Sequence, residues 1–179
     1  LRHQARPAAV STYSYRAFNE LIDQTANMLL SQGVERGEHV AVQMHTCPEF
    51  LMCLFGLAKI GAVLVPMNEQ YLQAECEYAL DMCSTRRAVV EPCYVELYDA
   101  IHADGRLDQG IIVARSEGGE EAMGYPLFSE LVAAEGTELE VPSDLSPDDP
   151  CEILFTSGTT SNPKGVILTH GNMVYSGYY

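Results

Sequence analysis

The residues best suited to chemistry lie in one loop near the end of the chain, residues 156–165. It reads Thr-Ser-Gly-Thr-Thr-Ser-Asn-Pro-Lys-Gly, so five hydroxyl side chains, two glycines and one lysine are packed together. Glycines let a backbone approach a ligand and point N–H groups at it. Hydroxyls donate hydrogen bonds to phosphate oxygens, and Lys164 adds a positive charge. The loop predicts a polyphosphate cradle, with a solvated hairpin loop of ordinary turn formers as the alternative.

This loop is not the phosphate loop of the Walker NTPases. Counting from Gly158 puts Pro163 where that motif needs its second glycine, and Gly165 where it needs a Mg²⁺-binding Ser or Thr. A Walker loop leads into a helix, whereas residues 166–168, Val-Ile-Leu, are typical of a strand. A nucleotide hydrolase of that class is therefore disfavoured.

The first third of the chain predicts the elements that position this loop. Residues 12–15 are β-prone and lead into a helix with one apolar stripe, which Gly33 ends. Thr46 and Glu49 have capping-box spacing, with Pro48 in the first turn, so a second helix is expected to open there. It runs to about Ile60, and Gly61 ends it.

Strands and further helices are expected to alternate along the rest of the chain. The predicted strands are residues 39–43, 62–65, 87–90, 111–113, 152–155 and 166–168. The other predicted helices are residues 71–83 and 95–103, and one that begins near His170 with Thr169 as its N-cap. This order predicts an α/β fold with a largely parallel sheet and helices on both faces.

Composition divides the chain into three parts. Residues 1–115 form the expected α/β core, residues 116–150 an acidic loop and linker, and residues 151–179 the phosphate-loop hairpin with the start of the next helix. Between Ser116 and Cys151 there are ten acidic residues and no lysine or arginine. We interpret this stretch as a solvated connector, with an interaction surface as the alternative.

The net charge limits which kinds of partner the protein can bind, and its cysteines indicate the cellular compartment. The net charge of -15 repels nucleic acid and anionic membrane surfaces, and it also requires any nucleotide site to be made locally. No apolar run approaches the roughly 20 residues of a membrane-spanning helix, and no secretory signal pattern is present. The six cysteines form no C-x-x-C pair, so they predict reduced core thiols in a cytoplasmic protein; a zinc or disulfide framework is the alternative.

Two histidines invite a sharper interpretation. His45, Cys47 and Glu49 lie close together, but their spacing suits no common metal-ligand pattern and a helix start explains it better, so no metal site is predicted. His170 follows the expected N-cap and is interpreted as a first-turn helix residue, with contact to substrate or CoA in a longer enzyme as the alternative.

Residues 153–166, Ile-Leu-Phe-Thr-Ser-Gly-Thr-Thr-Ser-Asn-Pro-Lys-Gly-Val, resemble the phosphate-loop signature of the AMP-binding, adenylate-forming superfamily, which includes acyl-CoA synthetases. Tyr15 with the helix after it, residues 37–41 and residues 56–68 also resemble early landmarks of that superfamily. Residues 104–150 match loosely. Within the superfamily, residues 47–50, 169–172 and 177–179 look most like carnitine/crotonobetaine-CoA ligases.

The resemblance implies that a carboxylate attacks the α-phosphate of ATP, giving an acyl-adenylate and pyrophosphate, and that the thiol of CoA then displaces AMP. Mg²⁺ shares the phosphate charge. It also implies that seven residues hold or shape the β- and γ-phosphate site: Thr156, Ser157, Gly158, Thr159, Thr160, Lys164 and Gly165.

The rest of the superfamily's machinery follows the phosphate loop in its usual order. It includes the adenine and Mg²⁺ motif, the ribose-binding Asp and the catalytic Lys, so we expect no catalytic residue in this chain. We expect it to behave as an inactive amino-terminal fragment, with an incomplete sheet, that self-associates through exposed apolar surface. An adenylation domain that loads a carrier-protein thiol, and a non-catalytic nucleotide-binding or interaction module, remain the alternatives.

Overall fold

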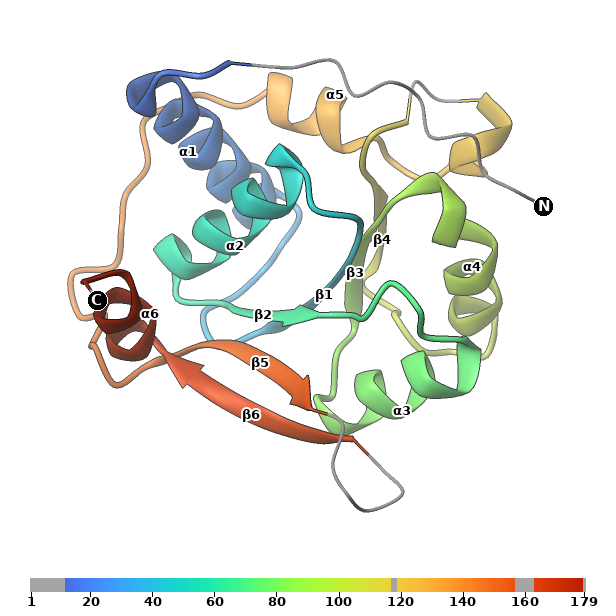
Figure 1. The fold of residues 1–179 in the computed structure, drawn as a ribbon. Helices are drawn as coiled ribbons and strands as arrows, with labels where there is room; N and C mark the ends of the chain where they lie inside the picture. Colours follow the sequence, from blue (N-terminus) through green and yellow to red (C-terminus); the bar gives the residue numbers. More distant parts are fainter. Residues whose placement is uncertain (1–11, 117–118, 157–162, 179) are drawn as a thin grey trace.

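A computed structural model describes residues 12–116, 119–156 and 163–178. One six-stranded sheet organises the chain, in the order β4-β3-β1-β2-β5-β6 (Figure 1). Its strands are β1 (His39–Gln43), β2 (Val63–Pro66), β3 (Arg87–Val90), β4 (Gly110–Val113), β5 (Pro150–Thr156) and β6 (Lys164–Thr169). The first five in this order run parallel, and β6 pairs antiparallel with β5. The predicted largely parallel α/β fold is confirmed.

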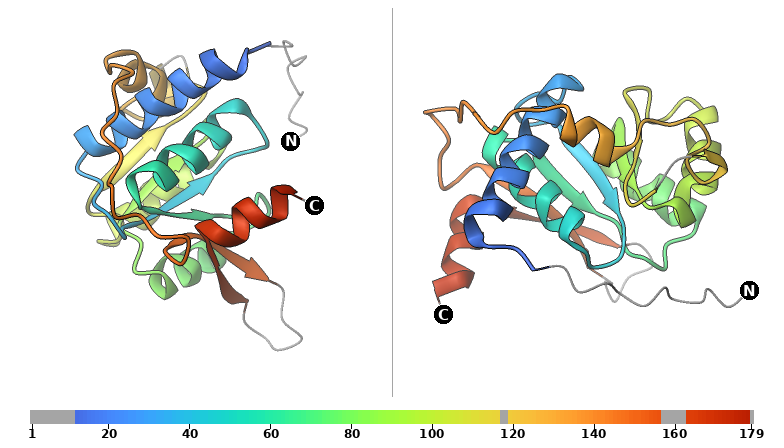
Figure 2. Two further views of the ribbon diagram at one scale, coloured as in Figure 1. Left: turned by 90° about the vertical axis from the view of Figure 1, so that its left-hand side faces the viewer. Right: turned by 90° about the horizontal axis from the view of Figure 1, so that it is seen from above.

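Helices cover both faces of the sheet (Figure 2). The α-helices are α1 (Tyr15–Ser31), α2 (Pro48–Ile60), α3 (Gln73–Met82), α4 (Val95–Ala103), α5 (Phe128–Ala133) and α6 (His170–Tyr178). Two short 3₁₀ helices, η1 (Pro92–Tyr94) and η2 (Gly119–Ala122), lie between them. The first core cluster joins α1, α2 and α5 to the sheet, and the second joins α3 and α4 to its other face.

Alternation along the central strands sends side chains into both cores. In β1, Val40 and Val42 belong to the first cluster, whereas Ala41 between them belongs to the second. All three are fully buried. Parallel strands covered on both faces are mostly apolar rather than alternating with polar residues. For this reason a short run such as residues 87–90, in which three of the four residues are apolar, predicted a strand at the correct position.

Helix ends follow local chemistry, with two corrections to the sequence analysis. Residues 12–15 form no strand, because Ser14 is the N-cap of α1 and its hydroxyl accepts from the N–H of Ala17 at 3.1 Å. The capping box expected from Thr46 and Glu49 is not formed: Cys47 is the N-cap of α2 and makes no side-chain cap bond. Proline in the first turn alone marks the start of this helix.

The acidic segment has more structure than its composition predicted. Residues 116–150 contain α5, and Phe128 and Val132 of this helix are buried in the first core cluster. Gln24 and Asn27 of α1 also donate to the backbone oxygens of Glu135, Gly136 and Glu138. A few apolar residues among the acidic ones are therefore enough to fix this connector on α1.

Candidate nucleotide-binding site

The β5–β6 hairpin holds the two ends of the predicted phosphate loop side by side. Thr156 and Lys164 form the last pair of the antiparallel ladder, and the Thr156 hydroxyl lies 3.4 Å from the backbone oxygen of Lys164, to which it donates. Ser157, Gly158, Thr159 and Thr160 lie outside the described residues. The structure thus places Thr156, Lys164 and Gly165 of the seven predicted site residues, all at the base of the loop.

Lys164 is exposed, and it forms no ion pair with a carboxylate of the described residues. Six of the eight lysines and arginines in the described residues form ion pairs, and Arg16 and Lys164 are the two that do not. The protein has a net charge of -15, and its electrostatic potential is therefore negative overall. The unpaired ammonium of Lys164 makes the potential locally positive. It provides the attraction for an anion that the whole molecule lacks.

Gly165 lies within β6, paired with Phe155, and not at a turn. A Cβ atom at this position would come within 3.1 Å of Ile153 Cγ2, a contact tighter than ordinary van der Waals packing. The described structure thus gives this glycine a packing reason: it lets the buried Ile153 side chain lie beneath the strand that carries Lys164.

An ion-pair cluster anchors the end of the hairpin opposite the loop. The backbone N–H groups of His170 and Gly171 donate to the oxygens of Asp149 and Pro147, at 3.1 and 2.7 Å. Arg36 pairs with Asp144 at 2.6 Å and with Asp149 at 2.9 Å. The N–H of Ser146 and the Arg36 guanidinium both hold the pKa of Asp149 below its ordinary value.

A tyrosine supports the loop end itself. The hydroxyl of Tyr78, on α3, donates to the backbone oxygen of Pro163 at 3.2 Å. Pro163 immediately precedes Lys164, so this bond ties the loop-side end of β6 to the helix layer. The sequence analysis missed both Tyr78 and Arg36, since their partners lie 85 and 108–113 residues away and no local pattern signals such contacts.

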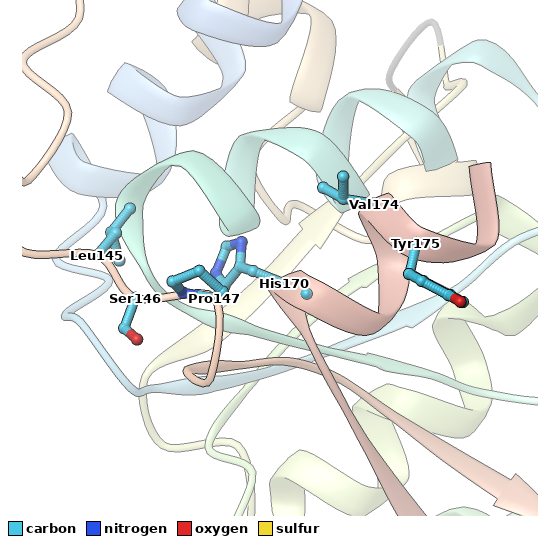
Figure 3. Close-up of a pocket in the computed structure, with 7 residues that line it drawn as sticks. Leu145, Ser146, Pro147, His170, Val174 and Tyr175 are labelled. Carbon is cyan, nitrogen blue, oxygen red and sulfur yellow. The ribbon is translucent and has the colours of Figure 1, made fainter. Parts of the chain in front are cut away.

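The cavity beside α6 is separate from the phosphate loop. It has a volume of about 480 Å³ and is lined mainly by apolar residues of the linker and of α6. Figure 3 shows His170 between Pro147 and the start of α6. α6 begins at the end of β6 opposite Lys164 (Figure 1). The cavity that α6 lines therefore lies beyond that end of the strand, roughly 17 Å from Lys164 at the usual strand rise.

His170 begins α6, as predicted, and Thr169 caps it. The Thr169 hydroxyl accepts from the N–H of Asn172 at 3.2 Å, and the Asn172 side chain accepts from the N–H of Thr169 at 3.0 Å. The Nε2 atom of His170 is buried and finds no hydrogen-bond partner among the described residues. Helix start is therefore the role that the geometry supports for this residue.

The structure does not gather His45, Cys47 and Glu49 into a metal site within the residues it describes. Cys47 is buried, and its thiol lies 3.5 Å from the sulfur of Met44. Burial raises the pKa of this thiol to about 11, so it stays protonated at neutral pH.

Comparison with known proteins identifies the family. The sequence matches the family of AMP-binding enzymes over residues 2–179. The chain belongs to that family. Among curated relatives, it is 41% identical over 170 residues to a crotonobetaine/carnitine-CoA ligase of Salmonella paratyphi C, covering 95% of this chain and 33% of the relative. The chain thus spans about a third of the length of the curated relatives it matches.

Solved structures of AMP-binding enzymes share the fold. The anthranilate CoA ligase AuaEII, solved with anthranoyl-AMP, superposes with a TM-score of 0.79 at 29% identity, over 87% of this chain and 29% of that one. MbtA of Mycobacterium smegmatis gives a TM-score of 0.81 at 28% identity, over 93% of this chain and 31% of that one. In the described part of the chain, no helix is both long and apolar enough to cross a bilayer.

Proposed function

We propose that this chain is the phosphate-loop-bearing amino-terminal part of an ATP-dependent acyl-CoA synthetase. The whole enzyme would join a carboxylic acid to CoA through an acyl-adenylate, releasing pyrophosphate and then AMP. The identity of 41% to a crotonobetaine/carnitine-CoA ligase favours a carnitine-like acid as the substrate.

The unpaired Lys164 at the mouth of the β5–β6 hairpin is the observation that carries this proposal. It follows Pro163, whose backbone oxygen is fixed by Tyr78, so the ammonium is presented from a strand tied to the helix layer. A cation held in this way binds the β- and γ-phosphates without first breaking an ion pair. The hydroxyls and N–H groups of residues 156–160 would complete the cradle.

The donor set of the loop suits phosphate oxygens better than a metal ion. Lys164 repels cations, and every residue of 156–161 except Gly158 carries a hydroxyl. Mg²⁺ would therefore enter with the nucleotide and be held mainly by the phosphates, which is its usual behaviour. In this proposal Mg²⁺ and CoA meet their main protein contacts in other parts of the enzyme.

In this proposal the three parts of the chain have separate roles. Residues 1–115 supply the α/β body, residues 116–150 carry the chain across α1, and residues 151–179 present the loop. Exposed apolar residues lie on α1, α2 and α6, namely Tyr15, Leu51, Phe55, Val174 and Tyr175. We expect the chain on its own to self-associate through them, and the whole enzyme to act in the cytoplasm.

Activity assays on the whole protein and on the 179-residue chain test this function. With crotonobetaine or carnitine, ATP, Mg²⁺ and CoA, the whole protein should form the thioester and release AMP and pyrophosphate. The 179-residue chain should form none. Hydrolysis of ATP to ADP by the whole protein, with no dependence on an acid, would contradict the proposal.

A further inference from the structure

Three side chains with metal-binding atoms meet away from the phosphate loop. The ligand atoms of His45, Glu91 and Cys93 all lie within 4.8 Å of one another, and no other such group of three occurs in the described residues. They belong to the segments that follow β1 and β3, neighbouring strands in the sheet. Neither the phosphate loop nor its anchors use any of them.

The sheet itself brings these residues together. Gln43 and Val90 form the last pair between β1 and β3, and the N–H of Glu91 then donates to the oxygen of Gln43 at 3.1 Å. Oε2 of Glu91 accepts from the backbone N–H of His45 at 3.1 Å and lies 2.5 Å from His45 Nδ1. Two of the three ligand atoms are therefore already adjacent, and Cys93 follows on η1.

The histidine ring is held from two further sides. Tyr94 stacks on it, with ring centroids 6.1 Å apart and an interplanar angle of 26°. The outer nitrogen, Nε2, lies 3.8 Å from Oε2 of Glu69. A small movement of the half-exposed Glu69 side chain would bring this carboxylate into hydrogen-bond distance of Nε2. A carboxylate bonded to the outer nitrogen of a histidine ligand is the common outer-shell arrangement of metal sites.

Glu91 is buried, and each of its carboxylate oxygens already has a partner. The residue is 5% exposed, and Oε1 accepts a bond from the Arg115 guanidinium. Oε2 is the oxygen that faces His45. The His45 side chain is 55% exposed and Cys93 is exposed, so an ion would approach from solvent on the side of these two residues and meet Glu91 beneath them.

We propose that His45 Nδ1, Glu91 Oε2 and Cys93 Sγ bind one divalent transition-metal ion of the zinc class. One imidazole, one carboxylate and one thiolate suit Zn²⁺ or Co²⁺ and disfavour Mg²⁺ and Ca²⁺, which prefer oxygen ligands alone. Binding removes the thiol proton of Cys93, which passes to solvent, and leaves the one ring proton of His45 on Nε2, the nitrogen that faces Glu69. Water would fill the fourth position.

Titration of the 179-residue chain with Co²⁺ tests the site directly. The wild-type protein should bind one ion and show a thiolate-to-cobalt charge-transfer band in the near ultraviolet. Cys93→Ser should abolish the band, and His45→Gln should weaken binding by about 100-fold. Glu69→Gln, which removes only the outer carboxylate, should weaken it by about 10-fold. Glu130→Gln, at an exposed site on α5, is the matched control and should bind like wild type.

Alkylation of the thiol gives a second measurement that does not depend on colour. Cys93 is the exposed member of the six cysteines and the other five are buried, so iodoacetamide should modify Cys93 in the folded protein and Zn²⁺ should slow that reaction. Circular dichroism confirms that each variant is folded. The proposal is overturned if no charge-transfer band forms, if the band survives in Cys93→Ser, or if Zn²⁺ leaves the alkylation rate unchanged.

Discussion

Gly61 marks the point where the end of α2, the turn around Arg36 and the linker meet. It has a φ of +73°, and a Cβ atom there would lie 2.8 Å from Leu145 Cδ2 and 3.1 Å from Arg36 Cγ. The N–H of Ala62 donates to the oxygen of Leu57 at 3.0 Å, which closes the helix end. Gly61→Ala therefore combines backbone strain with a collision against the linker.

The two contributions to this loss can be separated. A left-handed conformation costs a non-glycine residue about 1–2 kcal/mol. Because the atoms met are parts of flexible side chains, the collision should add about 1 kcal/mol, the low end of overpacking costs. The free energy of unfolding should fall by roughly 2–3 kcal/mol in total. Gly105→Ala has a similar φ of +87° with nothing within 4 Å of its Cβ, so it should lose only the backbone part.

Urea denaturation of wild type and both variants measures these losses. Adding Leu145→Ala to each variant isolates the linker contact, because it should reduce the Gly61→Ala loss and leave the Gly105→Ala loss unchanged. Equal losses for the two glycine variants, or a Gly61→Ala loss that Leu145→Ala does not change, would show that the linker does not pack at this helix end.

Three further predictions concern charged groups. Arg87→Met should lower the free energy of unfolding by about 3 kcal/mol in urea, because the partly buried Glu38 carboxylate would lose the buried cation 3.4 Å away. Arg86→Met, at an exposed ion pair, should cause no measurable change. Burial raises the pKa of Glu152 in the folded state, so its ionisation costs stability as pH rises through the folded pKa. Glu152→Gln should therefore raise the free energy of unfolding more at pH 7 than at pH 4, with a difference on the order of 1 kcal/mol, and an equal gain at both pH values would contradict this. Arg36→Gln removes both ion pairs to the linker and should speed limited proteolysis within residues 141–150, so an unchanged cleavage rate would count against this anchor.

Most of the fold could be predicted because local signals and tertiary structure agree. The predicted bounds of β1, β3 and α4 match the structure, and Gly61 ends α2 in the left-handed conformation that such positions favour. The prediction from sequence failed where contacts in the folded protein overrode a local sequence pattern. Residues at the start of α2 have capping-box spacing, yet Glu49 turns its carboxylate into a buried position where Oε2 has no described partner.

The sequence alone can propose which residue types form the candidate site, but not the contacts that support it. Hydroxyls, glycines and one lysine in a short loop indicate phosphate chemistry whatever the fold around them. The Tyr78 bond to Pro163, the Arg36 ion pairs and the His45–Glu91–Cys93 group all join segments that are distant in the sequence. Only the order of strands in the sheet brings such residues together, and that order is not visible in local periodicity.

Calorimetric titration of the chain with ATP and Mg²⁺ tests the central claim, that residues 156–165 bind polyphosphate. The wild-type chain should show weak, saturable binding, and Lys164→Ala should weaken it by about 10-fold or more, because a hydrogen bond to a charged group contributes about 1.5–3 kcal/mol. Arg16→Ala removes the other unpaired cation in the described residues and should leave the affinity unchanged. Equal affinity of wild type and Lys164→Ala, or no saturable binding by either, would contradict the claim.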